Sequence, residues 1–274
     1  MIGVNIGAGL GNRMFQLAYI YSLAKKHDLT FRLENWKHTS HHSPSTYDWM
    51  IERFMALPNY EHSSVKYDLE IIEKGDDFTT WVDRYCEEMR EKKVYLYGFF
   101  QNENYFKEYR EDLLELFKEP EFVTKEIVTC YREVGSYLED GIFLHVRLGD
   151  YVGHYKHWVH LEKYYLTVLQ EIPLEYPIFL FTNSWQNLPI VYPRLHAYLQ
   201  ERKHICIRDT DEVRCLYLMS RCRRGGICAN STYGWWAGWL NTNPEKVVYM
   251  PAQWMVDVGF KCSIYPEWGT LVAV

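Results

Sequence analysis

The sequence predicts an α/β protein with two Rossmann-like domains that face each other across a cleft. Apolar runs typical of buried strands alternate with amphipathic helix patterns, and this alternation begins at residue 1 and again at residue 141. The chain has 274 residues, of which 47% are hydrophobic, so each half is large enough to bury a core. We therefore expect domains at residues 1–138 and 139–274.

The first half opens with a β-α-β pattern and continues with less regular segments. Residues 38–45 are polar and predict a loop, and residues 47–92 are mixed and charged, which favours short helices. We expect strands at 1–6, 29–34 and 94–97, and helices at 12–27, 103–118 and 124–138.

The second half repeats strand and helix more regularly, which indicates a parallel sheet with its ligand site at the carboxyl ends of the strands. We expect strands at 142–147, 178–182, 205–207, 226–229 and 247–250, and helices at 161–172, 188–199, 211–220 and 232–240.

Charge and hydropathy exclude several classes of protein. The net charge of −6, without a long basic run, argues against a nucleic acid partner. No apolar run approaches the roughly 18–20 residues that span a bilayer. Glycines and Asn5 interrupt the first apolar stretch, so no signal peptide is expected. The prediction is a soluble cytoplasmic protein, or a catalytic fragment whose anchor has been removed.

Two segments of the second half have the features of an anion site. The segment HVRLGDY (residues 145–151) places Arg147 and Asp150 directly after an apolar run. The segment ANSTYGWWAGWL (residues 229–240) is a small polar loop that leads into an apolar helix pattern. A helix start offers backbone N–H groups and a positive dipole end to phosphate, and an arginine fork binds phosphate through two N–H groups. The pair predicts a nucleotide-linked substrate, whereas a structural Arg147–Asp150 ion pair is the alternative.

These segments, with three others, resemble glycosyltransferase family 11, the α-1,2-fucosyltransferases. GLGNRMFQ (residues 9–16) is similar to the family's G-x-G-N-x-x-F-Q signature. GFFQNENYF (residues 98–106) resembles its G-Y-F-Q-S-E-x-Y-F element, and MPAQW (residues 250–254) resembles its late P-x-x-W. The five segments occur in the family's order over nearly the whole chain.

The resemblance implies a GT-B-like fold, with an acceptor-side domain at residues 1–138 and a GDP-fucose-binding domain at residues 139–274. It implies an inverting galactoside α-1,2-fucosyltransferase-like enzyme that moves L-fucose from GDP-fucose to a sugar hydroxyl of a glycan acceptor. It further implies that no metal or other cofactor takes part.

The resemblance also implies roles for individual residues. Arg147 would receive charge from the β-phosphate, His145 would contact guanine or ribose, and Asn12 would lie near the β-phosphate and the fucose. The expected catalytic residues are Arg147, Asn12 and Asp150, and His154 and His157 are candidates for the acceptor side. The expected donor-binding residues are Gly11, His145, Arg147, Thr182, Asn183, Asn230, Ser231, Thr232 and Tyr233, with further positive charge from Arg223 and Arg224.

The chain departs from the family's pattern at three positions. Leu148 stands where the family has a second arginine, Phe181-Thr-Asn-Ser184 replaces F-S-D-D, and Cys215 replaces an acid. The last two changes remove carboxylates that could recognise guanine. Asp209, Asp211 or Glu212 are the expected substitutes.

Three other motifs have competing interpretations. The glycine loop before residue 12 resembles a dinucleotide fingerprint, but Asn12 occupies the third glycine position, which leaves a phosphate-approach loop or a purely structural turn. Asp209-Thr-Asp211 resembles a metal-binding D-x-D, yet its position before an apolar periodic run favours a helix N-cap. The histidine groups at 38, 41 and 42 and at 154, 157 and 160 lack a visible fourth zinc ligand.

Three alternative functions remain at this point: a transferase for another nucleotide sugar, a non-catalytic nucleotide- or glycan-binding protein, and an NAD-dependent oxidoreductase.

Overall fold

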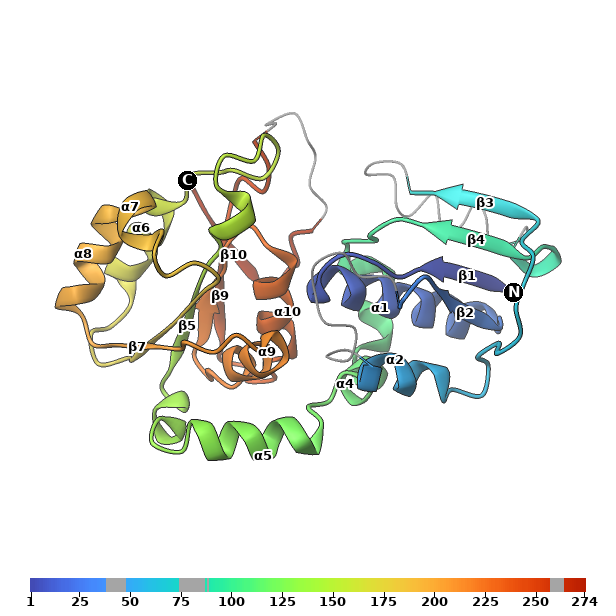
Figure 1. Cartoon of the computed structure of the whole chain (residues 1–274), viewed down its shortest axis with the longest axis horizontal. Helices are drawn as coiled ribbons and strands as arrows, with labels where there is room; N and C mark the ends of the chain where they lie inside the picture. The colour runs from blue at the N-terminus through green and yellow to red at the C-terminus, as the bar shows by residue number, and fades with distance from the viewer. Residues whose placement is uncertain (38–47, 74–86, 88, 257–263) are drawn as a thin grey trace. The chain divides into compact units, whose positions relative to one another are not determined.

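The computed structural model describes residues 1–37, 48–73, 87, 89–256 and 264–274 (Figure 1). The chain divides into two compact units, Met1–Lys118 with Lys261–Pro266, and Glu119–Phe260 with Glu267–Val274. Each unit is built on a parallel sheet. The expected loop at residues 38–45, with its three histidines, lies outside the described residues.

The division falls between Lys118 and Glu119, whereas the sequence predicted a boundary near 138–141. The reason is helix α5 (Glu121–Cys130), which packs on α9 (Glu212–Ser220) of the second unit. Glu126 of α5 pairs with Arg214 at 2.7 Å, and the Tyr131 hydroxyl donates to Asp209 at 2.9 Å. These polar contacts tie α5 to the second unit. Such contacts are not visible in the apolar patterns from which the boundary was predicted.

The first unit has a four-stranded parallel sheet in the order β2-β1-β4-β3. The predicted β-α-β opening is confirmed, since β1 pairs with β2 in parallel after the long buried helix α1. The elements are β1 (Ile2–Asn5), α1 (Leu10–His27), β2 (Phe31–Glu34), α2 (Asp48–Met55), β3 (Leu69–Ile72), β4 (Val94–Tyr97), the 3-10 turns η2 (Glu103–Tyr105) and η3 (Lys107–Tyr109), and α4 (Arg110–Leu116).

Two predictions for this unit are wrong in part. Only short helices were expected at residues 47–92. Helix α2 confirms one of them, but β3 is a strand in the same region. The expected helix at 103–118 is two 3-10 turns followed by α4. The Asn102 side chain caps the first turn by accepting from the Asn104 amide at 2.8 Å. Phe106 then leaves the helical region at φ −140° and ψ 1°, with its ring completely buried, so the core contact breaks the helix.

The second unit has a six-stranded parallel sheet in the order β10-β9-β8-β5-β6-β7. All five predicted strands are present, and β10 is an additional strand. The strands are β5 (Ile142–Val146), β6 (Ile178–Thr182), β7 (His204–Cys206), β8 (Gly225–Ile227), β9 (Val247–Pro251) and β10 (Gly269–Val272). The remaining helices are η4 (Gly135–Leu138), η5 (Gly149–Tyr151), α6 (Glu162–Glu171), α7 (Leu188–Val191), α8 (Pro193–Glu201) and α10 (Thr232–Leu240).

Two predicted helices of this unit are shorter or broken. The expected helix at 124–138 ends at Cys130 and is followed by the separate turn η4. The expected helix at 188–199 is divided into α7 and α8 at Pro193, because a proline has no N–H to continue the hydrogen-bond ladder of the preceding turn.

The sheet has a switch point at β5. The chain continues from β5 to β6 on one side, whereas β8 lies on the other side. Helices α6 and α8 cover one face of the sheet and α9 and α10 the other (Figure 1). In parallel sheets of this kind ligands bind beyond the carboxyl ends of the strands at the switch point. The segments that follow β5 and β8 therefore form the expected location of a site.

In the described part of the chain, no helix combines the length and apolar character of a membrane span.

Candidate functional site

The arginine loop, which we define as residues 147–151, follows β5 and is shaped by Asn183 at the end of β6. The Asn183 Oδ1 atom accepts a hydrogen bond from the Leu148 amide at 2.9 Å. Gly149 has φ +32°, and a Cβ atom there would lie 2.3 Å from Asn183 Nδ2. The loop can therefore make this turn only with glycine at 149. Asn183, predicted to bind the donor, supports the arginine loop.

The guanidinium of Arg147 is fixed by two neighbours. Its Nη2 atom lies 2.7 Å from Asp150 Oδ1, and its Cζ atom lies 5.2 Å from the centre of the Tyr151 ring. The Nε atom is buried and has no hydrogen-bond partner among the described residues. A buried N–H group without an acceptor is unfavourable, so this geometry favours an incoming anionic ligand.

His145 is the second buried group with an unpaired nitrogen. It points from β5 toward α10, is 3% exposed, and its Nδ1 atom has no hydrogen-bond partner among the described residues. Burial, with a further contribution from the Arg147 charge, lowers its pKa to about 3. The ring is therefore neutral at physiological pH. Helix α10 approaches it closely because residue 234 is glycine, where a Cβ atom would lie 2.7 Å from Nδ1.

The start of α10 lies beside the arginine loop. Ser231 is the N-cap, and its hydroxyl accepts from the Tyr233 amide at 3.4 Å. Asn230, which precedes this N-cap, donates to the carbonyl of His157, which lies a few residues beyond the arginine loop, at 3.0 Å. Thr232 is the first residue of α10, and the Tyr233 ring lies edge-on to His145 at 5.5 Å. The structure thus brings together the two segments in which the sequence predicted an anion site.

Two other predicted donor-binding residues have contacts within the protein. Asn230 is 3% exposed, and its Nδ2 atom donates to the carbonyls of His157 at 3.0 Å and Trp254 at 2.9 Å. The Thr182 hydroxyl accepts from the Ser184 amide at 3.2 Å. These contacts shape the segments around the arginine loop, and a role in donor binding stays a prediction.

The two candidate acceptor-side histidines form part of a stacked series of rings. The His154 and His157 rings stack at 4.6 Å, and His157 also stacks on Tyr151 at 5.2 Å. The His154 Nδ1 atom accepts from the amides of Lys156 and His157 at 3.2 and 3.3 Å. Burial, together with the charge of His154, lowers the pKa of His157.

The D-x-D segment is a helix cap, as the sequence favoured. Asp211 is the N-cap of α9, and its carboxylate accepts from the Arg214 amide at 2.8 Å. The Asp209 carboxylate accepts from the Arg214 guanidinium at 2.7 and 2.9 Å and from Tyr131. These partners already engage the Asp209 oxygens. Across the described ranges, no group of three or more His, Cys, Asp or Glu side chains could hold a metal ion.

Arg223 and Arg224 do not belong to this site. They precede β8, so they lie at the end of that strand opposite to Asn230. Arg223 pairs with Glu139 at 3.4 Å and Arg224 with Asp140 at 2.8 Å. The prediction that they supply positive charge to a bound anion is wrong, because β8, which the sequence predicted, separates them from Asn230 and both are paired with carboxylates.

The glycine loop of the first unit precedes α1, and Gly11 and Asn12 lie in the first turn of that helix. The Asn12 Oδ1 atom accepts from Gln101 Nε2 at 2.9 Å. Gln16 accepts from the Gly7 amide and donates to the Gly98 carbonyl, each at 2.9 Å. Two segments that resemble family signatures, residues 9–16 and 98–106, are thus in contact. No pattern in the sequence indicates that Gln16 and Gln101 join these two segments.

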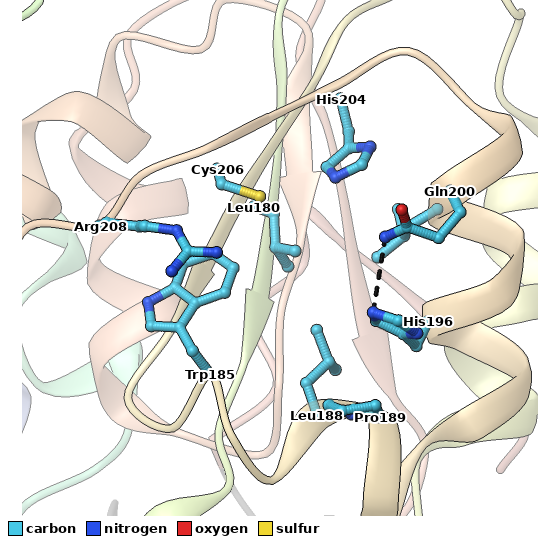
Figure 2. A pocket seen from close by; sticks show the side chains of 10 residues that line it. Leu180, Trp185, Leu188, Pro189, His196, Gln200, His204, Cys206 and Arg208 are labelled. Carbon is cyan, nitrogen blue, oxygen red and sulfur yellow. Dashed lines mark hydrogen bonds between the residues drawn. The ribbon is translucent and has the colours of Figure 1, made fainter.

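A separate pocket of about 120 Å³ lies in the second unit between β7 and α8 (Figure 2). Arg208 stacks on Trp185 at 4.9 Å along one side, and His196 and Gln200 lie on the other side (Figure 2). None of the predicted site residues lines this pocket. It is therefore distinct from the arginine loop and the start of α10.

The chain is similar in sequence to two transferases of Escherichia coli. It is 26% identical over 275 residues to an alpha-1,2-colitosyltransferase of Escherichia coli, covering 93% of this chain and 92% of the relative. It is also 27% identical over 168 residues to the O-antigen biosynthesis glycosyltransferase WbnK of Escherichia coli, covering 58% and 54% of the two chains.

Solved structures show the same fold. NodZ alpha-1,6-fucosyltransferase co-crystallised with GDP matches with a TM-score of 0.53 at 14% identity, covering 86% of this chain and 91% of that chain. The NodZ structure soaked with GDP-fucose matches with a TM-score of 0.51 at 12% identity, covering 87% and 92%. The model of glycosyl transferase family 11 matches residues 1–270. The chain is therefore a glycosyltransferase that belongs to glycosyl transferase family 11.

Proposed function

We propose that this glycosyltransferase moves L-fucose from GDP-fucose to a sugar hydroxyl of a glycan, with inversion and in α-1,2 linkage. The observation that carries the proposal is the buried Arg147 Nε atom, which has no partner among the described residues and lies two residues after His145, whose ring packs against α10. The relative that transfers colitose in alpha-1,2 linkage supports the linkage, and the GDP-fucose-soaked neighbour supports the donor.

The residues around Arg147 suit the difficult part of this reaction. As the bond between the sugar and the diphosphate breaks, negative charge grows on the β-phosphate. Fixed hydrogen-bond donors in a poorly solvated site stabilise such charge in the transition state. We assign this role to Arg147, with the Ser231 and Thr232 hydroxyls and the Tyr233 amide on the other phosphate oxygens. No metal or other cofactor enters this scheme.

His145 suits contact with the nucleoside because it is neutral. An uncharged imidazole donates from one nitrogen and accepts at the other, so it can bind a ribose hydroxyl or a base edge. Thr182, Asn183 and Asn230 complete the proposed donor side by holding the surrounding segments. Asp150 orients Arg147 through their ion pair.

We further propose the GT-B arrangement, in which the first unit serves the acceptor and faces the second across a cleft. Asn12 and Gly11 would then act near the β-phosphate and the fucose. His154 and His157 are the proposed acceptor-side groups of the second unit.

A second candidate donor is an activated colitose. The relative whose match covers 92% of its length is an alpha-1,2-colitosyltransferase. The decisive experiment incubates the enzyme with GDP-fucose or nucleotide-activated colitose and a panel of galactosides, N-acetylglucosamine and rhamnosides. Mass spectrometry detects the product, and NMR defines its linkage and anomeric configuration. A fucosylated α-1,2 product supports the proposal, and exclusive transfer of colitose overturns the fucose assignment.

Nucleotide binding distinguishes the remaining alternatives. GDP should raise the melting temperature more than UDP, ADP or NAD does. A shift with GDP but no transfer to any acceptor would indicate a binding protein, and a larger shift with another nucleotide would indicate a different donor.

A further inference from the structure

We propose that Tyr164 and Tyr165, two consecutive buried residues of α6, are positioning residues for the donor site. They hold the carboxyl ends of β8 and β5 and so set the spacing between the arginine loop and the start of α10. This inference rests on the proposed function and deepens it, because it names residues that act on the donor site through the backbone. Neither tyrosine is among the site residues that the sequence predicted.

Strands β5 and β8 lead to the two segments of the anion site. The pairing of β5 with β8 ends at Leu144 and Ile227. Arg147 follows three residues after Leu144, and Ser231 follows four residues after Ile227. Beyond the last pair, the β5–β8 register no longer sets the distance between the two segments. A preorganised anion site therefore needs another contact that holds both strand ends.

The two tyrosine hydroxyls bind the backbone one residue beyond this last pair. The Tyr165 hydroxyl donates to the His145 carbonyl at 3.0 Å, and the Tyr164 hydroxyl donates to the Cys228 carbonyl at 2.9 Å. Both tyrosines are completely buried, so solvent does not compete for either carbonyl. Burial raises the pKa of Tyr165 well above its ordinary 10, so this hydroxyl stays protonated and remains a donor.

Helix α6 is itself anchored near both of its ends. At its start, the Glu162 carboxylate accepts from the amides of Arg194 at 2.7 Å and Leu195 at 3.2 Å, which belong to α8. Near its other end, Arg202 donates to the Leu169 carbonyl at 2.9 Å. One anchored helix therefore holds both strand ends through neighbouring side chains, which is the rigid support that a preorganised site requires.

The test compares Tyr165→Phe and Tyr164→Phe with the matched control Tyr198→Phe. Each change keeps the ring and removes a hydroxyl that donates to a backbone carbonyl. Tyr198 donates to the Leu169 carbonyl at 3.1 Å, near the C-terminal end of α6 and away from the two strand ends.

The expected result is a loss in turnover rather than in donor affinity. Tyr165→Phe and Tyr164→Phe should each lower kcat with GDP-fucose about 5–10-fold, the scale of one lost hydrogen bond. KM should change less than about twofold, because preorganised groups act mainly on the transition state. Tyr198→Phe should lose stability but keep the wild-type kcat. Assays are run below the melting temperature of every variant, so that unfolding does not contribute.

Double-mutant cycles give a readout that a merely structural role would not change. Each tyrosine variant should cost about threefold less kcat in the Arg147→Lys background than in the wild-type protein, because the spacing matters only while the arginine fork is present. The double variant of Tyr164→Phe with Tyr165→Phe should lose less than the product of the two single losses, because either missing bond already releases the spacing.

The two proposals fail in different ways. If the wild-type protein does not transfer fucose from GDP-fucose, the proposed function is wrong, and this inference is wrong with it. If the wild-type protein is active but both tyrosine variants keep the kcat of Tyr198→Phe, the inference alone is overturned. Losses that are unchanged in the Arg147→Lys background would overturn it as well.

Discussion

The loops after β1 and after β5 are alike in sequence pattern but differ in what anchors the nearby arginine. Each follows a buried strand of a parallel sheet, and each has a nearby arginine. Arg13 is 2% exposed and donates to the carbonyls of Ala8 at 2.9 Å and Trp36 at 3.1 Å. Arg147 keeps a buried Nε atom that meets no acceptor within the described residues. Arg13 is thus anchored by two backbone carbonyls, whereas Arg147 is anchored by a carboxylate and an aromatic ring.

The largest expected effect distinguishes these two arginines. Arg147→Lys keeps the charge but loses the planar fork, so kcat should fall ~10²–10³-fold, as for one lost transition-state donor. Arg13→Lys removes hydrogen bonds to two carbonyls and should lower the free energy of unfolding by roughly 1–3 kcal/mol. Steady-state kinetics and urea unfolding of both variants check this. Near-wild-type turnover of Arg147→Lys would refute the assignment.

The next effect concerns the unpaired His145. Its pKa of about 3 lies below the ordinary 6.5, so the folded state resists protonation that the unfolded state accepts. Stability is therefore fully present above pH 6.5 and decreases as the pH falls from 6.5 toward 3. Between pH 7 and pH 5 the loss attributable to His145 should be about 2 kcal/mol. His145→Asn should remove this slope, whereas parallel unfolding curves for both proteins would contradict it.

A smaller effect is expected at the stacked histidines. His154→Ala and His157→Ala should each lower kcat/KM less than about tenfold, below the ~10²–10⁴ of a general base. The reason is that each ring supports Tyr151 or a neighbouring ring rather than acting alone. The measurement is kcat/KM against pH for both histidine variants. Asp150→Asn is measured in the same way, because Asp150 is the competing candidate for the general base. A thousandfold loss in one histidine variant, with its acidic limb abolished, would identify that histidine as the base.

The smallest expected effect is that of chelation. The carboxylate of Asp209 already accepts from Arg214 and Tyr131, so removal of divalent cations should leave GDP-fucose turnover unchanged. Turnover is compared before and after exhaustive EDTA treatment, with Mn²⁺ added back as the control. Activity that disappears and returns with Mn²⁺ would show that a metal takes part.

The strands that the sequence failed to predict are both at edges of sheets. β3 and β10 each pair with one neighbour, and their residues are mostly exposed or half-buried. They therefore lack the continuous apolar run that marked central strands such as β5. Helix breaks were missed for a related reason, since Phe106 and the Asn102 cap depend on tertiary contacts and local side-chain bonds rather than on periodicity.

In the candidate site, too, some features could be predicted from the sequence and others depend on tertiary contacts. The sequence predicted the positions of Arg147, after a strand, and of Ser231, at a helix start. The prediction was possible because a parallel sheet brings the carboxyl ends of its strands to one edge. The roles of Asn183, Gln16 and Tyr151 depend on partners far away in the chain or on which face of a loop a ring occupies. No spacing rule contains that information.

Asn230 has a consequence for experiments in other hosts. It begins the sequence Asn-Ser-Thr, an acceptor for N-linked glycans, yet its amide nitrogen is buried and donates to two backbone carbonyls. Attachment of a glycan replaces one of the two N–H groups of that nitrogen, so at least one of these bonds must break. When the protein is passed through a eukaryotic secretory pathway, glycosylation at Asn230 would therefore mark chains modified before folding. The fraction that carries the sugar becomes a measure of how slowly this unit folds.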